Sequence, residues 1–166
     1  CAEQIRNDID YHNFPVTIVS VGGGLAYGNL GYSHHAVQDF SLMRSMPNII
    51  LATPGDPSEV SYSLDYLIKN PQPSYLRLNK AGEKVISGLS SNFSLGLPRL
   101  IRGSLSNENT ILTTGSILGL AVEAWEEYED KEKWSLYSFP LWGEKARKIT
   151  YDYLKGFKRI ISIEEH

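Results

Sequence analysis

The apolar residues of the chain recur with two periods, one of about two residues and one of about 3.6 residues. The shorter period is typical of a half-buried β-strand and the longer of an amphipathic helix. In the first eighty residues this pattern predicts strands over residues 16–21, 49–53 and 74–78, with helices between them and one leading helix. Such a β-α-β-α-β order favours parallel pairing of the strands.

Capping residues indicate where two of these helices begin. Ser33 is expected to cap a helix that ends at Pro47 and has one apolar side, made of Ala36, Val37, Phe40 and Met43. The next helix follows Asp56, which acts as an N-cap, with Pro57 at the first helical position and Glu59 three residues after the cap. The predicted apolar side of this helix consists of Val60, Leu64, Leu67 and Ile68.

The second half of the chain repeats the alternation after a less regular stretch. Residues 81–109 are rich in Gly, Ser, Asn and Pro and are predicted to be a linker. Strands are then expected over residues 110–114, 134–139 and 159–163, with intervening helices whose apolar stripes include Ala121 and Ile149. The chain is therefore predicted to be α/β, with mostly parallel sheets flanked by helices, in two consecutive incomplete units over residues 1–80 and 110–166.

Composition narrows the class of protein further. The 166 residues are 42% hydrophobic and 21% charged, which is typical of a globular protein, and no stretch approaches the ~20 apolar residues of a membrane span. The net charge of −3 and the absence of a basic stripe argue against nucleic acid as a partner. Cys1 is the single cysteine and no signal peptide precedes it, so a cytoplasmic location is expected.

A glycine-rich segment over residues 22–31 leads to two adjacent histidines, His34 and His35. Glycines let a backbone approach a ligand closely, and the N-terminus of the predicted helix lowers the pKa of a nearby imidazole. A neutral His34 is suited to donating a hydrogen bond or to moving a proton. Alternatively, the glycines only make a tight turn, and both histidines face solvent or bind the backbone.

Other chemical templates do not match the chain. The glycine cluster lacks the Gly-Lys-Ser/Thr ending of a phosphate-binding loop and the spacing of a dinucleotide-binding motif. His12 lies in a separate segment, and no cysteine cluster or His-Glu-x-x-His sequence is present, so no protein-only metal site is expected. The sequence around Ser33 lacks the closing glycine of a hydrolase nucleophile motif.

Several segments together resemble the pyrimidine-binding domain of the transketolase family. The resemblance is most specific in Gly31-Tyr32-Ser33-His34-His35-Ala36-Val37-Gln38-Asp39 and in Arg44-Ser45-Met46-Pro47-Asn48. Residues 54–60 and 73–80 also match this domain. The second half is less specific, and its segment Ile161-Ser162-Ile163-Glu164-Glu165-His166 resembles the start of the C-terminal domain of the family, as in the C-terminal section of a split transketolase.

The resemblance implies an enzyme that uses thiamine diphosphate and Mg²⁺ to move a two-carbon ketol unit from a ketose, or a ketose phosphate, to an aldose. In this family the cofactor lies between the pyrimidine domain of one subunit and the diphosphate-binding domain of another. A homodimer, or a partner subunit carrying that second domain, is therefore expected. The glutamate that binds the aminopyrimidine would precede Cys1, and Glu3 does not match it. Most cofactor contacts thus lie outside this chain, no cofactor-binding residue is assigned within it, and the chain is expected to be inactive alone.

The resemblance also assigns roles to individual residues. His34 matches the catalytic histidine that contacts the donor sugar near the reacting carbonyl, and His35 is a further substrate-binding candidate. Lys80 occupies the position of an arginine that binds the substrate phosphate; lysine keeps the charge but loses the bidentate geometry. Asp39 and Arg44 match family positions too, and a charged pair between them is expected to support the helix.

Two departures from the family pattern bear on the substrate. Leu30 stands where relatives carry an aspartate that recognises a donor hydroxyl, and Gly22 stands where they carry a histidine. Both changes favour a different donor and a branch of the family whose enzyme is split between two chains. The alternatives are an enzyme similar to 1-deoxy-D-xylulose-5-phosphate synthase or to the β subunit of a 2-oxoacid dehydrogenase, and a non-catalytic subunit. Arg77 is interpreted as a residue with either a structural or a functional role.

Overall fold

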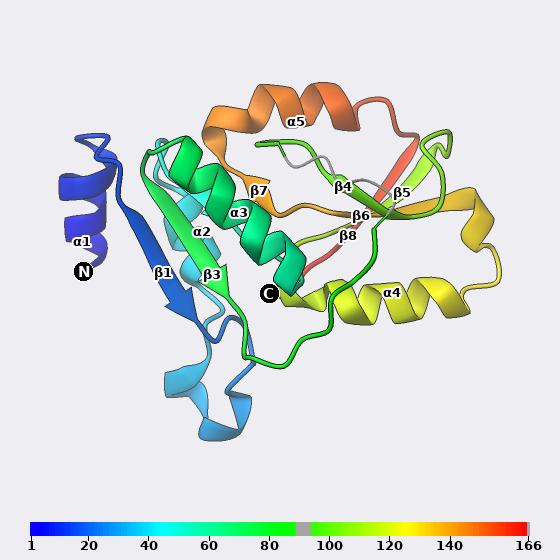
Figure 1. Cartoon of the computed structure of the whole chain (residues 1–166), viewed down its shortest axis with the longest axis horizontal. Coiled ribbons are helices and arrows are strands. Elements are labelled where there is room, and N and C mark those ends of the chain that lie inside the picture. The colour runs from blue at the N-terminus through cyan, green and yellow to red at the C-terminus, as the bar shows by residue number, and fades with distance from the viewer. Residues whose placement is uncertain (89–93, 166) are drawn as a thin grey trace.

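A computed structural model describes residues 1–88 and 94–165 and contains two four-stranded sheets (Figure 1). The first sheet has the order β1-β3-β2-β7, with β1 at Thr17–Val21, β3 at Ser74–Leu78 and β2 at Ile50–Ala52. These three strands are parallel, as the sequence predicts. The edge strand β7, Leu141–Trp142, comes from the second half of the chain and pairs antiparallel with β2.

The second sheet has the order β4-β6-β5-β8. Strands β5 (Asn109–Thr113), β6 (Trp134–Ser138) and β8 (Arg159–Ile163) are parallel and lie close to their predicted positions. The strand β4 (Arg99–Arg102) pairs antiparallel with β6. The predicted α/β class, with mostly parallel sheets flanked by helices, is therefore confirmed.

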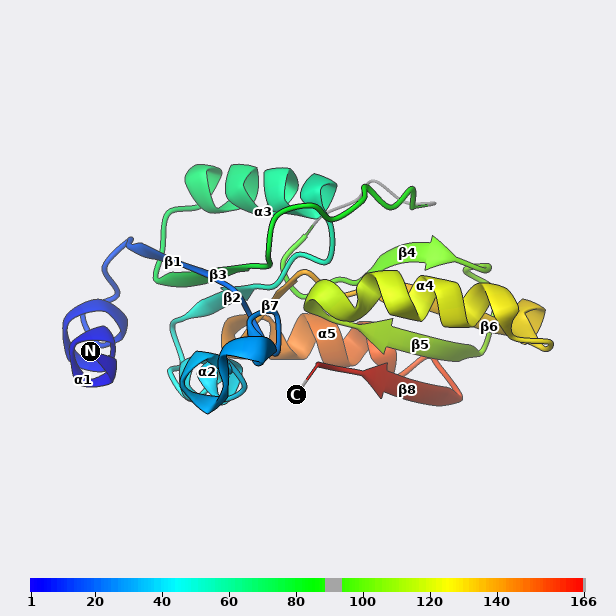
Figure 2. The ribbon, with the colours of Figure 1, turned by 90° about the horizontal axis from the view of Figure 1, so that it is seen from below.

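Helices cover both faces of each sheet. In the first sheet, α2 (Asp39–Arg44) and α3 (Pro57–Lys69) lie on opposite faces (Figure 2). In the second, α4 (Leu118–Glu127) and α5 (Arg147–Leu154) lie on opposite sides (Figure 1). The leading helix consists of α1 (Ala2–Gln4) and a π-helical continuation over Ile5–Asp10. Within the described residues, no helix is both long enough and apolar enough to span a membrane.

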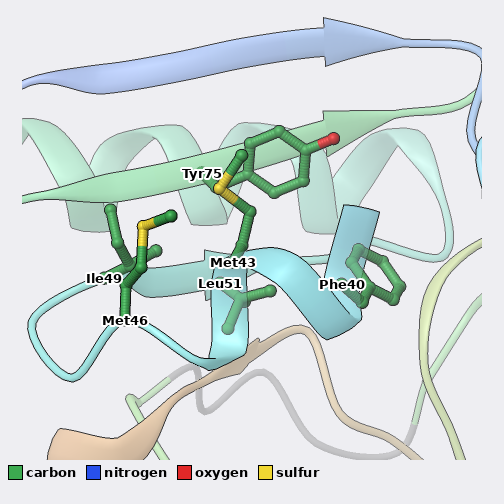
Figure 3. Packing of buried hydrophobic residues seen from close by; sticks show 6 residues of the cluster. All are labelled: Phe40, Met43, Met46, Ile49, Leu51 and Tyr75. Carbon is green, nitrogen blue, oxygen red and sulfur yellow. The ribbon is translucent and has the colours of Figure 1, made fainter. Parts of the chain in front are cut away.

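Clusters of apolar side chains fill the space between each sheet and its helices. Figure 3 shows the cluster between α2 and the first sheet, in which Phe40, Met43, Met46, Ile49, Leu51 and Tyr75 pack together. A second cluster, under α3, contains Leu67 and Leu76, and a third, under α4, contains Leu118 and Leu136. Alternation along the strands delivers side chains to both faces, as expected for sheets covered by helices on each side.

The strands β4 and β7 were not predicted. Strand β7 contains only two residues, too few to display a period of two. The four residues of β4 do not alternate, because Leu100 and Ile101 are adjacent between two arginines. Strand β4 also lies inside the segment 81–109, which was expected to be a linker throughout. The division into units over residues 1–80 and 110–166 stays a prediction.

The predicted helix start at Ser33 is wrong. Residues Tyr32–His34 form a short 3-10 turn, and α2 begins only at Asp39. Between these elements the backbone of Ala36 pairs with that of Gly24 through two hydrogen bonds, of 2.9 and 3.1 Å. This isolated bridge uses the amide and carbonyl groups that a helix would need for its own ladder.

The predicted cap of α3 is confirmed, but its buried side differs from the prediction. Asp56 accepts a hydrogen bond from the backbone amide of Glu59 at 2.7 Å. The buried residues of the helix are Glu59, Ser63 and Leu67, whereas Leu64 and Ile68 are exposed. An ion pair with Arg99 holds the carboxylate of Glu59 in the protein interior. The helix therefore turns Glu59 inward, and Leu64 and Ile68 of the predicted apolar side face solvent.

Candidate functional site

The glycine-rich loop, residues 22–35, lies at the carboxyl edge of the first sheet. It follows β1, and Lys80 follows β3, which is the neighbouring parallel strand. The register pairs Val21 with Leu78, and the amide of Gly22 donates to the carbonyl of Leu78 at 3.0 Å. The fold therefore brings the loop and Lys80 to the same edge, although they are far apart in the sequence.

Tyr27 connects this loop to Lys80. Its ring lies directly over Gly22, where any side chain would collide with it. Gly22 also has a φ of +86°, a conformation that L-residues with side chains rarely adopt. The ammonium of Lys80 lies 5.8 Å from the centroid of the Tyr27 ring, within the range of a cation–π contact. Gly22 is thus required by the packing and the backbone conformation of this loop.

His34 is exposed at the end of the Tyr32–His34 turn. Its Nδ1 lies 3.0 Å from the hydroxyl of Ser33, and its Nε2 has no hydrogen-bond partner within residues 1–88 and 94–165. The preceding Gly31 has a φ of +85°, which makes the sharp entry to this turn. Because α2 begins only at Asp39, the sequence argument that a helix N-terminus acts on His34 is wrong. One ring nitrogen is nevertheless available to a ligand from solvent.

His35 is half-buried and closes the loop upon itself. Its Nε2 lies 3.3 Å from the carbonyl oxygen of Gly28, to which it donates when the proton is on that nitrogen. Its ring also meets the ring of Tyr32 edge-on, with centroids 6.2 Å apart. These contacts match the alternative of a histidine bound to the backbone, so a substrate-binding role for His35 stays a prediction.

Arg77 lies at the centre of a buried charged cluster beside the loop. It is 4% exposed and forms ion pairs with Asp39 at 3.5 Å and with Glu165 at 3.2 Å. Its guanidinium also stacks 3.7 Å from the ring centroid of Phe40. The predicted pairing of Asp39 with Arg44 is therefore wrong, because Asp39 at the first turn of α2 faces the strand β3 and not its own helix.

A tyrosine extends this cluster to β1. The hydroxyl of Tyr75 donates to Asp39 at 2.7 Å and accepts from the hydroxyl of Ser20 at 2.6 Å. Burial, together with the nearby Asp39 carboxylate, raises the pKa of Tyr75 to about 12. The phenol thus keeps its proton and remains a donor to Asp39. Burial lowers the pKa of Arg77, but the two carboxylates oppose this effect.

A second buried cluster surrounds Arg99 of β4 and was not predicted. Arg99 donates to Glu59 of α3 at 3.0 Å and to the carbonyl of Ile86 at 3.2 Å. The carboxylate of Asp56 lies 4.0 Å from Arg99 and accepts from the amide of Ile86 at 2.7 Å. The cluster joins the start of α3, the segment before β4 and β4 itself. The partners of Arg99 lie 13 to 43 residues away from it in the sequence, so no local pattern reveals them.

The carboxylate of Glu59 is fully buried, like that of Asp56 in the same cluster. It accepts hydrogen bonds from the amide of Gly55 at 2.8 Å and from the hydroxyl of Ser138 at 2.9 Å. Burial raises the pKa of Glu59, while these hydrogen bonds and Arg99 act in the opposite direction. The contact with Ser138 also ties α3 to β6, so this cluster links the two sheets.

A cavity of about 630 Å³ lies apart from the predicted site residues. Leu112, Thr114, Trp142 and Glu164 are among its lining residues, together with Arg44. None of His34, His35 and Lys80 contributes to this lining. The exposed edge that carries His34 and the cavity are therefore separate features.

The residues that the structure describes offer no group of three or more His, Cys, Asp or Glu side chains that could hold a metal ion. The resemblance implies a metal ion at the diphosphate end of thiamine diphosphate, and the described part of this chain offers no group of carboxylates and imidazoles that would fit that ion. No residue of the chain is therefore assigned to the cofactor.

Comparisons with known proteins agree with this architecture. Residues 1–82 match the family model described as transketolase, pyrimidine binding domain. The chain is 34% identical to one of the subunits of apulose-4-phosphate transketolase from Phocaeicola vulgatus, over 99% of this chain and 53% of that protein. It is 31% identical to 1-deoxy-D-xylulose-5-phosphate synthase from Pelotomaculum thermopropionicum, over 75% of this chain and 19% of that protein.

Solved structures share the fold. A split gene transketolase, described as an inactive beta4 tetramer, superposes with a TM-score of 0.77 at 23% identity, over 99% of this chain and 52% of that one. The chain spans about half the length of the apulose-4-phosphate transketolase relative and of this tetrameric protein. The matched domain, the related sequences and the shared fold lead to one conclusion: the chain belongs to the transketolase family.

Proposed function

We propose that this chain is one part of a transketolase-like transferase that uses thiamine diphosphate to move a two-carbon ketol unit from a ketose, or a ketose phosphate, to an aldose. One observation carries the proposal: the glycine-rich loop over residues 22–35, called the His34 loop below, lies at the same sheet edge as Lys80. Both belong to the segment that matches the transketolase pyrimidine-binding domain. The names of the apulose-4-phosphate transketolase relatives support the same reaction class.

Within this proposal the exposed residues bind the sugar. His34 donates a hydrogen bond to an oxygen near the reacting carbonyl, or moves a proton there, because one of its nitrogens is open to solvent. Lys80 provides a positive charge for a substrate phosphate at the same edge. Leu30 is exposed in the loop and has no hydrogen-bonding side chain, so the donor is recognised without the contact that an aspartate would make.

The cofactor and a second domain complete the proposed enzyme. When bound, thiamine diphosphate would supply the nucleophilic carbon that the transfer of a ketol unit requires. The diphosphate and Mg²⁺ are held by a diphosphate-binding domain outside the described residues, either in a second copy of a longer chain or in a partner subunit. The chain alone is therefore expected to be inactive. A cytoplasmic location stays a prediction from the single cysteine.

A second reaction is supported by the similarity to 1-deoxy-D-xylulose-5-phosphate synthases and by Leu30. An enzyme of that kind takes a 2-oxoacid as donor and releases carbon dioxide. A ketol transferase takes a ketose and releases none. The two functions can therefore be separated by their products.

The test is a coupled assay on the complete assembly, purified through a tag on this chain from its source cells. The assembly is supplied either with a ketose phosphate and an aldose or with pyruvate and an aldehyde. We expect formation of a new ketose without release of carbon dioxide, and only in the presence of thiamine diphosphate. Release of carbon dioxide from pyruvate would favour the second reaction, and turnover of neither pair would contradict both.

A further inference from the structure

We infer that Arg77 is a positioning residue that sets the conformation of the His34 loop through its bridge to Glu165. The inference rests on the proposed function, because it assigns a purpose to the loop that carries His34. It goes beyond that function because it makes the conformation of the loop depend on Glu165, which follows strand β8 of the second sheet. The charged bridge consists of Asp39, Arg77, Glu165 and Ser116.

The bridge spans the two sheets. Arg77 belongs to β3 of the first sheet, and its Nη2 donates to Oε2 of Glu165 at 3.2 Å. The hydroxyl of Ser116 donates to the same carboxylate oxygen at 2.9 Å. Ser116 lies in the 3-10 turn Gly115–Ile117 that precedes α4, so the second sheet and its helix fix the position of Glu165.

The loop backbone lies directly on this bridge. A Cβ atom at Gly23 would collide with the guanidinium of Arg77, and one at Gly24 would collide with the carboxylate of Glu165. Both glycines are buried, so no water layer separates them from the two charged groups. The backbone path of residues 22–24 is therefore shaped by the ion pair beneath it.

The same backbone leads to the histidines. Gly24 pairs with Ala36 through two hydrogen bonds, and Ala36 follows His35 directly. The loop between these two residues contains the Tyr32–His34 turn, whose amide of His34 donates to the carbonyl of Gly31 at 2.9 Å. A displacement of Gly24 therefore moves both ends of the loop that presents His34.

Burial explains why the bridge has one preferred arrangement. A guanidinium that is 4% exposed needs anionic partners, because an unpaired buried charge is strongly unfavourable. Asp39 is already held by Tyr75, so it cannot follow Arg77 freely. Loss of Glu165 leaves Arg77 with one carboxylate and removes the group on which Gly24 rests.

The test compares Glu165→Gln with Glu164→Gln in the same assembly. The two glutamates are adjacent in the sequence but differ in their contacts. Glu165 pairs with Arg77, whereas Glu164 lines the cavity and forms no ion pair among the residues described. Amide hydrogen exchange is measured by mass spectrometry on peptides that cover residues 22–36. We expect exchange at least about tenfold faster in Glu165→Gln and unchanged in Glu164→Gln, with peptides from β5 and β6 unaffected.

A milder variant keeps the test decisive where Glu165→Gln does not fold. Ser116→Ala removes one hydrogen bond from Glu165 and is expected to accelerate exchange over residues 22–36 by a smaller factor. Unchanged exchange in this segment for the folded variants would overturn the inference, as would an equal acceleration across the whole chain, because that pattern reports a general loss of stability.

Turnover provides the second readout. In an active assembly, Glu165→Gln is expected to lower kcat, and Glu164→Gln is expected to leave it unchanged. Unchanged turnover in Glu165→Gln would overturn the role of the bridge in presenting His34. Hydrogen exchange needs no substrate, so an assembly without ketol transfer would contradict the proposed function and leave the structural result intact.

Discussion

Replacement of Arg99 by alanine is expected to lower the free energy of unfolding by about 3–5 kcal/mol, the usual range when one partner of a buried ion pair is removed. Arg99 is the positive partner of Glu59, whose side chain is fully buried. Its loss leaves the carboxylates of Glu59 and Asp56 inside the protein without the nearby guanidinium. It also removes a hydrogen bond to the carbonyl of Ile86. The measurement is urea denaturation of the chain, followed by circular dichroism.

Arg102→Ala is the matched control, because Arg102 lies on the same strand and pairs with Glu126, which is half exposed. An exposed pair of this kind contributes about 0–1 kcal/mol. The double variant Glu59→Gln/Arg99→Ala should recover part of the loss, since glutamine carries no charge and still accepts a hydrogen bond from Gly55. Equal losses of unfolding free energy in Arg99→Ala and Arg102→Ala would show that the buried cluster contributes no more stability than an exposed ion pair.

His34→Ala is expected to reduce kcat of the complete assembly by about 10²–10⁴-fold, the range for loss of a residue that transfers a proton in the transition state. The change should leave the unfolding temperature nearly constant, because His34 is exposed and its only side-chain hydrogen bond within the described residues is to Ser33. The measurement combines steady-state kinetics with thermal unfolding of the same preparation.

His12→Ala serves as the control for this change. His12 is also exposed, but it lies before β1, where its ring packs near Tyr11 and Phe14. We expect this variant to retain full activity. Turnover of His34→Ala at the rate of the unchanged assembly would contradict the assignment of His34.

The sequence predicts those elements whose signals are local. The start of α3 is encoded within four residues, from Asp56 to Glu59, and the structure has the cap hydrogen bond at that place. The strands β3 and β8 contain five residues each, three of them apolar, and are long enough to show in the pattern of residues. The resemblance to transketolases likewise depends on contiguous segments, and the matched residues 1–82 confirm it.

Features that depend on distant partners were missed or misplaced. The helix expected from Ser33 is displaced to Asp39 because Ala36 pairs with Gly24, a contact that no local propensity reveals. The expected partner of Asp39 was Arg44 on the same helix, but its ion pair is with Arg77 on β3. The buried pair of Glu59 and Arg99 overrides the apolar stripe of α3 for the same reason.

The resemblance assigned substrate contacts to His34 and Lys80, which lie far apart in the sequence. The parallel register of β1 and β3 brings the loop that carries His34 to the same sheet edge as Lys80. The catalytic role of His34 and the phosphate contact of Lys80 stay predictions. The role of Arg77 could be inferred only from the fold, because its partner Glu165 lies 88 residues further along the chain.

Binding of thiamine diphosphate to the complete assembly in the presence of Mg²⁺, measured by isothermal titration calorimetry, tests whether this chain is part of a thiamine-diphosphate-dependent enzyme. We expect saturable binding with one site for each copy of this chain, and no binding to the chain alone. The absence of binding to the complete assembly would contradict the claim that this chain belongs to a working thiamine-diphosphate-dependent enzyme.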